Sequence, residues 1–167
     1  MTNRKTRKNK NTHIQHHHLL LRMETKKFPK REEQEKVANL IRRIILDLDM
    51  DIIGAPHLHY LDTPLENKGF TGVASIQTSH VSFHFWDVPA KGWLQNTESN
   101  SLLQFDIYTC GNLKKHHIKK VIKHLSIYEP TRIDIDVMNR KHTLKLDAHY
   151  QWDSLTPVSF RDWITSI

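Results

Sequence analysis

Residues 71–87 read T-G-V-A-S-I-Q-T-S-H-V-S-F-H-F-W-D, two runs that alternate in the manner of β-strands on either side of Ser79. Alternate side chains of a strand point to opposite faces, so the second run is predicted to have an apolar face of Val81, Phe83 and Phe85 and an opposite face of His80, Ser82, His84 and Trp86. Residues 104–111, Q-F-D-I-Y-T-C-G, alternate likewise and lead to Cys110, the only cysteine. A serine, two histidines and a cysteine are therefore expected near strand ends.

Length and composition predict one soluble domain. A chain of 167 residues with 38% hydrophobic and 26% charged residues can bury a substantial core. The sequence has no apolar run long enough to span a membrane, and its N-terminus lacks the apolar core of a signal peptide. A single cysteine excludes an intrachain disulfide framework, which favours a reducing, cytoplasmic location.

The positive charge is concentrated at the N-terminus. Residues 1–31 contain ten Lys and Arg against one Glu, a net of +9, whereas the rest has fifteen Lys and Arg against seventeen Asp and Glu, a net of −2. We therefore expect a basic, disordered arm at residues 1–15 and a nearly neutral body at residues 16–167. No aromatic residue interleaves the charges of the arm, so nucleic acid is not the expected partner.

Apolar spacing predicts two helices. Apolar residues recur every three or four positions in residues 31–48 (Val37, Leu40, Ile41, Ile44, Ile45 and Leu48) and in residues 113–125 (Ile118, Val121, Ile122 and Leu125). Both stripes predict one buried face per helix. Residues 159–167 are too short for a firm assignment and would form at most a helical cap over one sheet edge.

Alternating runs predict further strands near residues 16–21, 50–61, 131–137 and 142–150, the last with Leu144, Leu146, Ala148 and Tyr150 on one face. The order β-α-β-β-β-β-α-β-β predicts an α+β fold, a two-layer sandwich of a mainly antiparallel sheet with helices packed on one face. His57 and His59 would share a strand face. Two histidines without a third ligand do not predict a metal site.

The motifs resemble those of the bacterial and archaeal type of S-adenosylmethionine decarboxylase proenzyme. They comprise Ser79-His80, then His84 and Trp86, then an aspartate-containing strand that ends Tyr108-Thr109-Cys110-Gly111. The resemblance spans about residues 18–140 and implies the same sandwich, paired as a homodimer with active sites near the interface. It also implies a pyruvoyl cofactor, because decarboxylation of an amino acid needs an electron sink that no free side chain supplies.

The resemblance implies that Ser79 becomes the pyruvoyl group. Its hydroxyl would attack the carbonyl of Thr78, the resulting ester would break by elimination, and the enamine left behind would hydrolyse. The products would be a β subunit of residues 1–78 and an α subunit of residues 79–167.

Three more residues match family positions. His84 corresponds to the histidine that removes the α-proton of the serine, and a bend in the strand is expected to bring it back to Ser79. Cys110 corresponds to the cysteine that returns a proton to the substrate carbon after carbon dioxide leaves. Thr71 occupies the place of a hydroxyl residue that steadies the scissile carbonyl.

The sequence departs from the family pattern at three places. Thr78 stands where the family has glutamate, and Asp87 follows Trp86 where the family has Pro-Glu. Leu61 falls at the position of an adenine-stacking phenylalanine, so Tyr60 or Phe70 would supply the aromatic ring, with Tyr60 as the main candidate. Asp87 is the candidate for a contact to substrate hydroxyls. The connection at residues 88–101 is longer than in the family. It would form either a lid or a surface insertion.

The leading interpretation is a pyruvoyl-dependent enzyme that decarboxylates S-adenosylmethionine for spermidine synthesis. The changed adenine contact leaves a related decarboxylase of arginine or ornithine open. Thr78 leaves open a homologue that does not process itself and acts as a regulatory partner.

Overall fold

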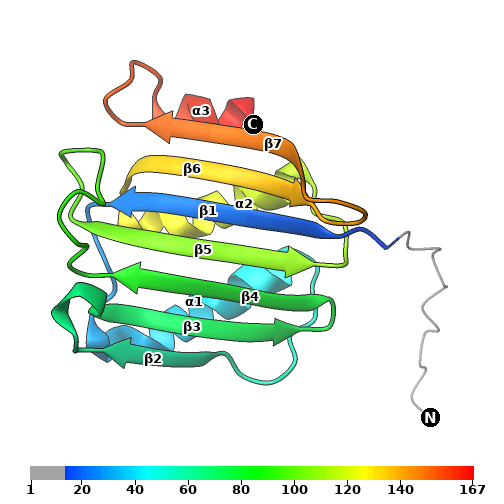
Figure 1. The fold of residues 1–167 in the computed structure, drawn as a ribbon, viewed down its shortest axis with the longest axis horizontal. Coiled ribbons are helices and arrows are strands. Elements are labelled where there is room, and N and C mark those ends of the chain that lie inside the picture. Colours follow the sequence, from blue (N-terminus) through cyan, green and yellow to red (C-terminus); the bar gives the residue numbers. More distant parts are fainter. Residues whose placement is uncertain (1–13) are drawn as a thin grey trace, which may run out of the picture.

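A computed structural model describes residues 14–167 (Figure 1). Nearly all of the predicted basic arm, residues 1–15, lies outside the described residues. Within them the chain forms one seven-stranded sheet in which neighbouring strands run antiparallel, in the order β2-β3-β4-β5-β1-β6-β7. No helix in this part of the chain is long and apolar enough to cross a membrane.

The elements follow the predicted order and add one helix at the end. They are β1 (His17–Thr25), α1 (Gln34–Asp47), β2 (His57–Leu61), β3 (Gly69–Ile76), β4 (Ser79–Trp86), β5 (Ser101–Thr109), α2 (Lys115–Leu125), β6 (Pro130–Asn139), β7 (Lys145–Asp153) and α3 (Phe160–Ser166).

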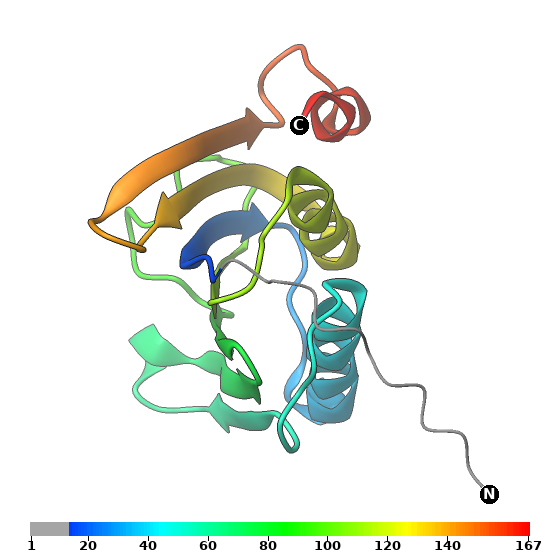
Figure 2. The same ribbon diagram turned by 90° about the vertical axis from the view of Figure 1, so that its right-hand side faces the viewer.

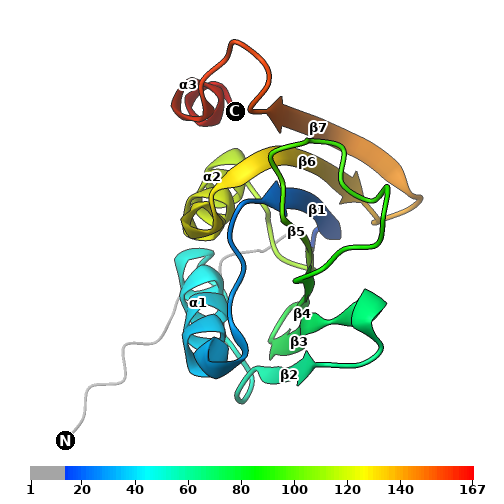
Figure 3. The same ribbon diagram turned by 90° about the vertical axis from the view of Figure 1, so that its left-hand side faces the viewer.

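The three helices lie on one face of the sheet and leave the other face without a helical cover (Figures 2 and 3). The helices bury the apolar faces predicted from their sequence spacing. Residues at most 3% exposed include Ile41, Ile44 and Ile45 of α1 and Val121 and Ile122 of α2. They pack on the apolar faces of the strands in one continuous core. The prediction of a two-layer α+β sandwich with helices on one face is confirmed.

Alternation fixes which side chains of β4 meet the core. Val81, Phe83 and Phe85 are buried on the helix side, as predicted. On this antiparallel strand the register with β3 and β5 is continuous from Ser79 to Trp86. A one-residue slip would expose the apolar set, so burial of that set holds the register.

Two local predictions are corrected, and the open assignment at the end of the chain is resolved. Only residues 57–61 of the predicted strand at 50–61 form β2; before them Ile52 makes a single bridge to Ile76. In β7 a register shift separates the pair of Met138 with Leu146 from the pair of Val137 with Ala148. This bulge breaks the alternation on which the prediction depended, and Leu144 and Leu146 are exposed. The end of the chain does form a short helix, α3.

Candidate functional site

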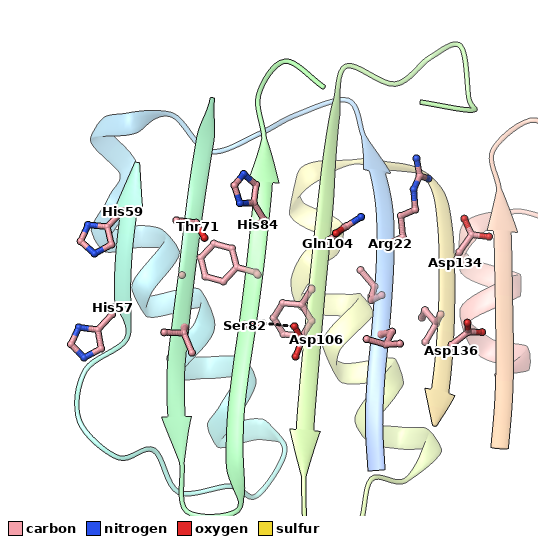
Figure 4. A pocket seen from close by; sticks show the side chains of 17 residues that line it. Arg22, His57, His59, Thr71, Ser82, His84, Gln104, Asp106, Asp134 and Asp136 are labelled. Atoms are coloured by element: carbon pink, nitrogen blue, oxygen red, sulfur yellow. Dashed lines mark hydrogen bonds between the residues drawn. The ribbon is translucent and has the colours of Figure 1, made fainter. Parts of the chain in front are cut away.

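A hollow of about 880 Å³ lies on the face of the sheet that the helices leave free (Figure 4). Strands β1 to β6 contribute polar side chains to it from alternate positions, which is why polar residues from distant parts of the chain meet there. Its polar lining consists of Arg22, His57, His59, Thr71, Ser82, His84, Gln104, Asp106, Asp134 and Asp136. The predicted shared face of His57 and His59 is confirmed.

His84 stands in this hollow opposite Thr71 of the neighbouring strand. Its ring stacks on that of Trp86 with centroids 3.9 Å apart. Burial lowers the pKa of the His84 imidazole, and its buried Nε2 has no hydrogen-bond partner within residues 14–167. A neutral imidazole with one free nitrogen is suited to accept a proton.

Ser79 and Cys110 lie together at the hairpin end of the sheet. Gln77 and Thr78 form the two-residue connection between β3 and β4, and the backbone N–H of Cys110 donates a 2.9 Å hydrogen bond to the carbonyl oxygen of Thr78. The Thr109 hydroxyl donates to that of Thr78 at 2.9 Å. The predicted scissile carbonyl and the predicted proton donor are therefore neighbours.

The cysteine thiol has a histidine beside it. Cys110 Sγ lies 3.7 Å from Nδ1 of His16, and the same nitrogen is 3.3 Å from the hydroxyl of Tyr108. His16 precedes β1, which pairs with β5 so that the start of β1 meets the end of β5. This pairing explains why two residues far apart in sequence come together.

The structure does not bring His84 to Ser79 within one chain. All of β4 is described, and it pairs without a register shift, so the predicted bend is absent from it. Five residues of extended strand span about 17 Å, which is too far for the two side chains to meet. Thr71 pairs with His84 and not with Thr78, whose carbonyl receives its hydrogen bond from Cys110.

Tyr60 and Asp87 bind each other. The Tyr60 hydroxyl donates a short hydrogen bond to Oδ2 of Asp87, and the Tyr60 ring packs on Phe70 with centroids 5.0 Å apart on the core side of the sheet. Asp87 is only 6% exposed, and burial raises the pKa of its carboxyl. Neither side chain is among those that line the hollow, so their contact with substrate stays a prediction.

The connection at residues 88–101 is held by a fully buried carboxylate. Glu24 of β1 accepts hydrogen bonds from the backbone N–H groups of Gln95 and Asn96, from the Ser99 hydroxyl and from Arg22. Trp93 of this connection packs edge-on against Trp86 with ring centroids 5.5 Å apart. These contacts hold the long connection at the sheet end, next to the Trp86 ring on which His84 stacks.

Glu24→Gln is expected to lower the free energy of unfolding by about 3 kcal/mol, because several donors lose a buried charged acceptor. Burial alone would raise the pKa of Glu24, but these hydrogen bonds outweigh it and hold the pKa below its usual 4.5. The wild-type advantage should therefore be full above pH 4.5 and shrink as pH falls through the lower folded-state value. Urea unfolding at several pH values measures both effects.

The matched control is Glu98→Gln in the same connection. The Glu98 side chain is 46% exposed, and within residues 14–167 it pairs with Lys26 and the Ser154 hydroxyl alone. Exposed pairs of this kind contribute about 0–1 kcal/mol. An equal loss of stability in both variants would contradict the anchoring role of Glu24.

Fold and site together define an α+β protein with an antiparallel sheet backed by helices and a polar hollow on the free face of that sheet. Ser79, His16 and Cys110 lie at one end of the sheet. A family model described as S-adenosylmethionine decarboxylase matches residues 17–141, most of the chain. The chain belongs to this family, which implies a decarboxylase, that is, carboxy-lyase, activity. No individual curated protein matches the chain significantly.

Sequence reasoning missed several residues of the site. The sequence places His80 on a strand face without a role, and it gives Asp106 and His16 only as members of predicted strands. The adjacency of Ser79 and His80 was a signal for the first of these. Nothing in the sequence indicated Glu24, because its partners Gln95 and Asn96 lie 71 and 72 residues away along the chain.

Proposed function

We propose that the chain is a self-cleaving, pyruvoyl-dependent S-adenosylmethionine decarboxylase of the bacterial and archaeal type. The observation that carries the self-cleavage is the backbone of Ser79, whose φ is +144°. A positive φ is rare for a residue other than glycine and costs about 1–3 kcal/mol. Such strain beside the Thr78–Ser79 peptide bond favours a reaction that breaks this bond.

The surroundings of Ser79 fit the formation of a pyruvoyl group there. The Cys110 N–H already donates to the carbonyl that the serine would attack, so negative charge on this oxygen would be stabilised. Once formed, the pyruvoyl carbonyl supplies the electron sink for decarboxylation. Cys110 would hold a proton at Sγ for return to the substrate carbon, with the imidazole of His16 as its neighbour.

We further propose that the enzyme is a homodimer of processed α and β subunits, 79–167 and 1–78, in which His84 and Thr71 of one copy serve Ser79 of the other. The separation of about 17 Å along β4 supports this arrangement, since His84 cannot reach its own Ser79. His84 lies on the sheet face that the helices leave free, which is the face a second copy would approach. The product would then serve aminopropyl transfer to spermidine in the cytoplasm.

Replacing Cys110 by serine separates cleavage from turnover. The backbone N–H at this position remains, so Cys110→Ser should still split after Thr78. Serine is a much weaker proton donor than a thiol, and we expect decarboxylation to fall about 10²–10⁴-fold. Release of labelled carbon dioxide from carboxyl-labelled S-adenosylmethionine measures this loss, and normal turnover in the cleaved variant would remove Cys110 from the reaction.

A second candidate is a pyruvoyl decarboxylase of arginine or ornithine. Three carboxylates, Asp106, Asp134 and Asp136, line the hollow and would attract a basic side chain. Tyr60, the candidate adenine contact, instead packs on the core side. Parallel assays of the cleaved protein with S-adenosylmethionine, arginine and ornithine decide between the substrates. A chain that stays uncleaved and turns over none of them would favour the regulatory homologue.

A further inference from the structure

Ser79 has a histidine of its own chain in contact with its hydroxyl. Ser79 Oγ lies 3.2 Å from Nδ1 of His80, the next residue. Neighbouring side chains of a regular strand point to opposite faces, so this contact requires a departure from strand geometry. The positive φ of Ser79 is that departure. The strained backbone thus turns the serine hydroxyl toward an imidazole nitrogen.

The other nitrogen of His80 faces a carboxylate. His80 Nε2 lies 3.7 Å from Oδ1 of Asp106 on β5, and the His80 ring packs edge-on against Tyr108 with centroids 5.9 Å apart. Asp106 is itself held by the Ser82 hydroxyl and lies 3.4 Å from Nε2 of His18. A carboxylate near Nε2 favours the tautomer with the proton on that nitrogen, which leaves Nδ1 free to accept the serine proton.

The same end of the sheet holds the group that the serine would attack. The Thr78 carbonyl oxygen accepts the Cys110 N–H at 2.9 Å. A hydroxyl nucleophile, an imidazole in contact with it, a carboxylate behind the imidazole and a donor on the carbonyl oxygen are the parts that acyl transfer requires. All of them come from one chain.

We propose that His80 is the general base for the first step of self-cleavage and that Asp106 is its positioning residue. The inference rests on the proposed self-cleavage. Ser79 Oγ forms a bond to the carbonyl carbon of Thr78 as its proton passes to His80 Nδ1. The bond from that carbon to the Ser79 nitrogen then breaks, the imidazolium returns the proton to this nitrogen, and an ester with a free amine results. Removal of the α-proton in the next step remains with His84.

The test follows chain cleavage after cell-free synthesis of wild type and variants. His80→Ala is expected to cleave about 10²–10⁴-fold more slowly than wild type, and added imidazole should accelerate it. The His80 side chain is 44% exposed, so imidazole can enter the space it leaves. Asp106→Asn should also slow cleavage, and Asp106→Glu should restore part of the rate.

His149→Ala is the matched control, because His149 is an exposed histidine that also contacts an aspartate, Asp136, at 2.7 Å. It should cleave at the wild-type rate. Hydroxylamine, which cuts esters, separates the two steps. It should split His84→Ala, in which the ester accumulates, and leave His80→Ala intact.

A wild-type rate in His80→Ala, or a slow rate that imidazole fails to raise in a variant with the wild-type circular dichroism spectrum, would overturn the assignment of His80. If His80→Ala does not fold, His80→Gln is measured in the same way, and a wild-type rate there overturns it equally. A wild-type chain that never cleaves would instead refute the proposed self-cleavage, so the two failures are distinguishable.

Discussion

Ser79→Ala should remain a single chain of 167 residues without detectable decarboxylase activity. Alanine has no hydroxyl to attack the Thr78 carbonyl, so neither the ester nor the pyruvoyl group can form. Loss of the electron sink should lower turnover by about 10⁶-fold or more, to the level of the uncatalysed reaction. Denaturing electrophoresis and carbon dioxide release measure the two consequences on the same sample.

Ser75→Ala and Ser79→Gly separate loss of the Ser79 hydroxyl from other effects of substitution in this hairpin. Ser75→Ala changes an exposed serine of the same hairpin and should cleave normally. Ser79→Gly also lacks the hydroxyl but accepts the positive φ, so it should be about 1 kcal/mol more stable than Ser79→Ala. Cleavage of Ser79→Ala would show that another residue is the nucleophile.

Mixing two inactive variants should restore cleavage if His84 acts on the partner copy. His84→Ala alone should cleave about 10²–10⁴-fold more slowly than wild type, and Ser79→Ala alone should not cleave at all. In a mixed dimer one site combines the intact Ser79 of the first variant with the intact His84 of the second. The chain that carries His84→Ala should therefore be the one that splits.

Differently tagged chains, produced together and purified through both tags, give the mixed dimer for this measurement. His57→Ala is the control, since His57 lines the same hollow but has no proposed part in cleavage; alone, it should cleave normally. Absence of cleavage in a verified mixed dimer would mean that His84 acts within its own chain, which the separation of about 17 Å along β4 opposes.

Much of the fold could be predicted because the spacing of apolar residues is directly visible in the sequence and indicates which faces are buried. The alternation of residues 81–86 gave β4 its two faces, and the stripe from Val37 to Leu48 gave α1 its buried side. The prediction failed in β7, where one bulge shifts the register between Leu146 and Ala148. A bulge depends on the pairing with β6 and leaves no pattern in the strand itself.

The sequence names candidate residues for the site but does not predict how their side chains are arranged. The resemblance to the family selected Ser79, His84 and Cys110 together, and the pairing of β4 with β5 brings the Cys110 backbone next to Thr78 and Ser79. The sequence predicts a bend that returns His84 to Ser79, and the continuous register of β4 contradicts this bend. The bond between Tyr60 and Asp87 likewise depends on tertiary packing, which a single sequence does not display.

The most direct test of self-cleavage is the intact mass of freshly purified protein under denaturing conditions. We predict two chains divided after Thr78. The larger should begin at position 79 with a blocked pyruvoyl end, lighter by the elements of ammonia than a chain that begins with serine. A single unmodified chain after prolonged incubation would contradict the account.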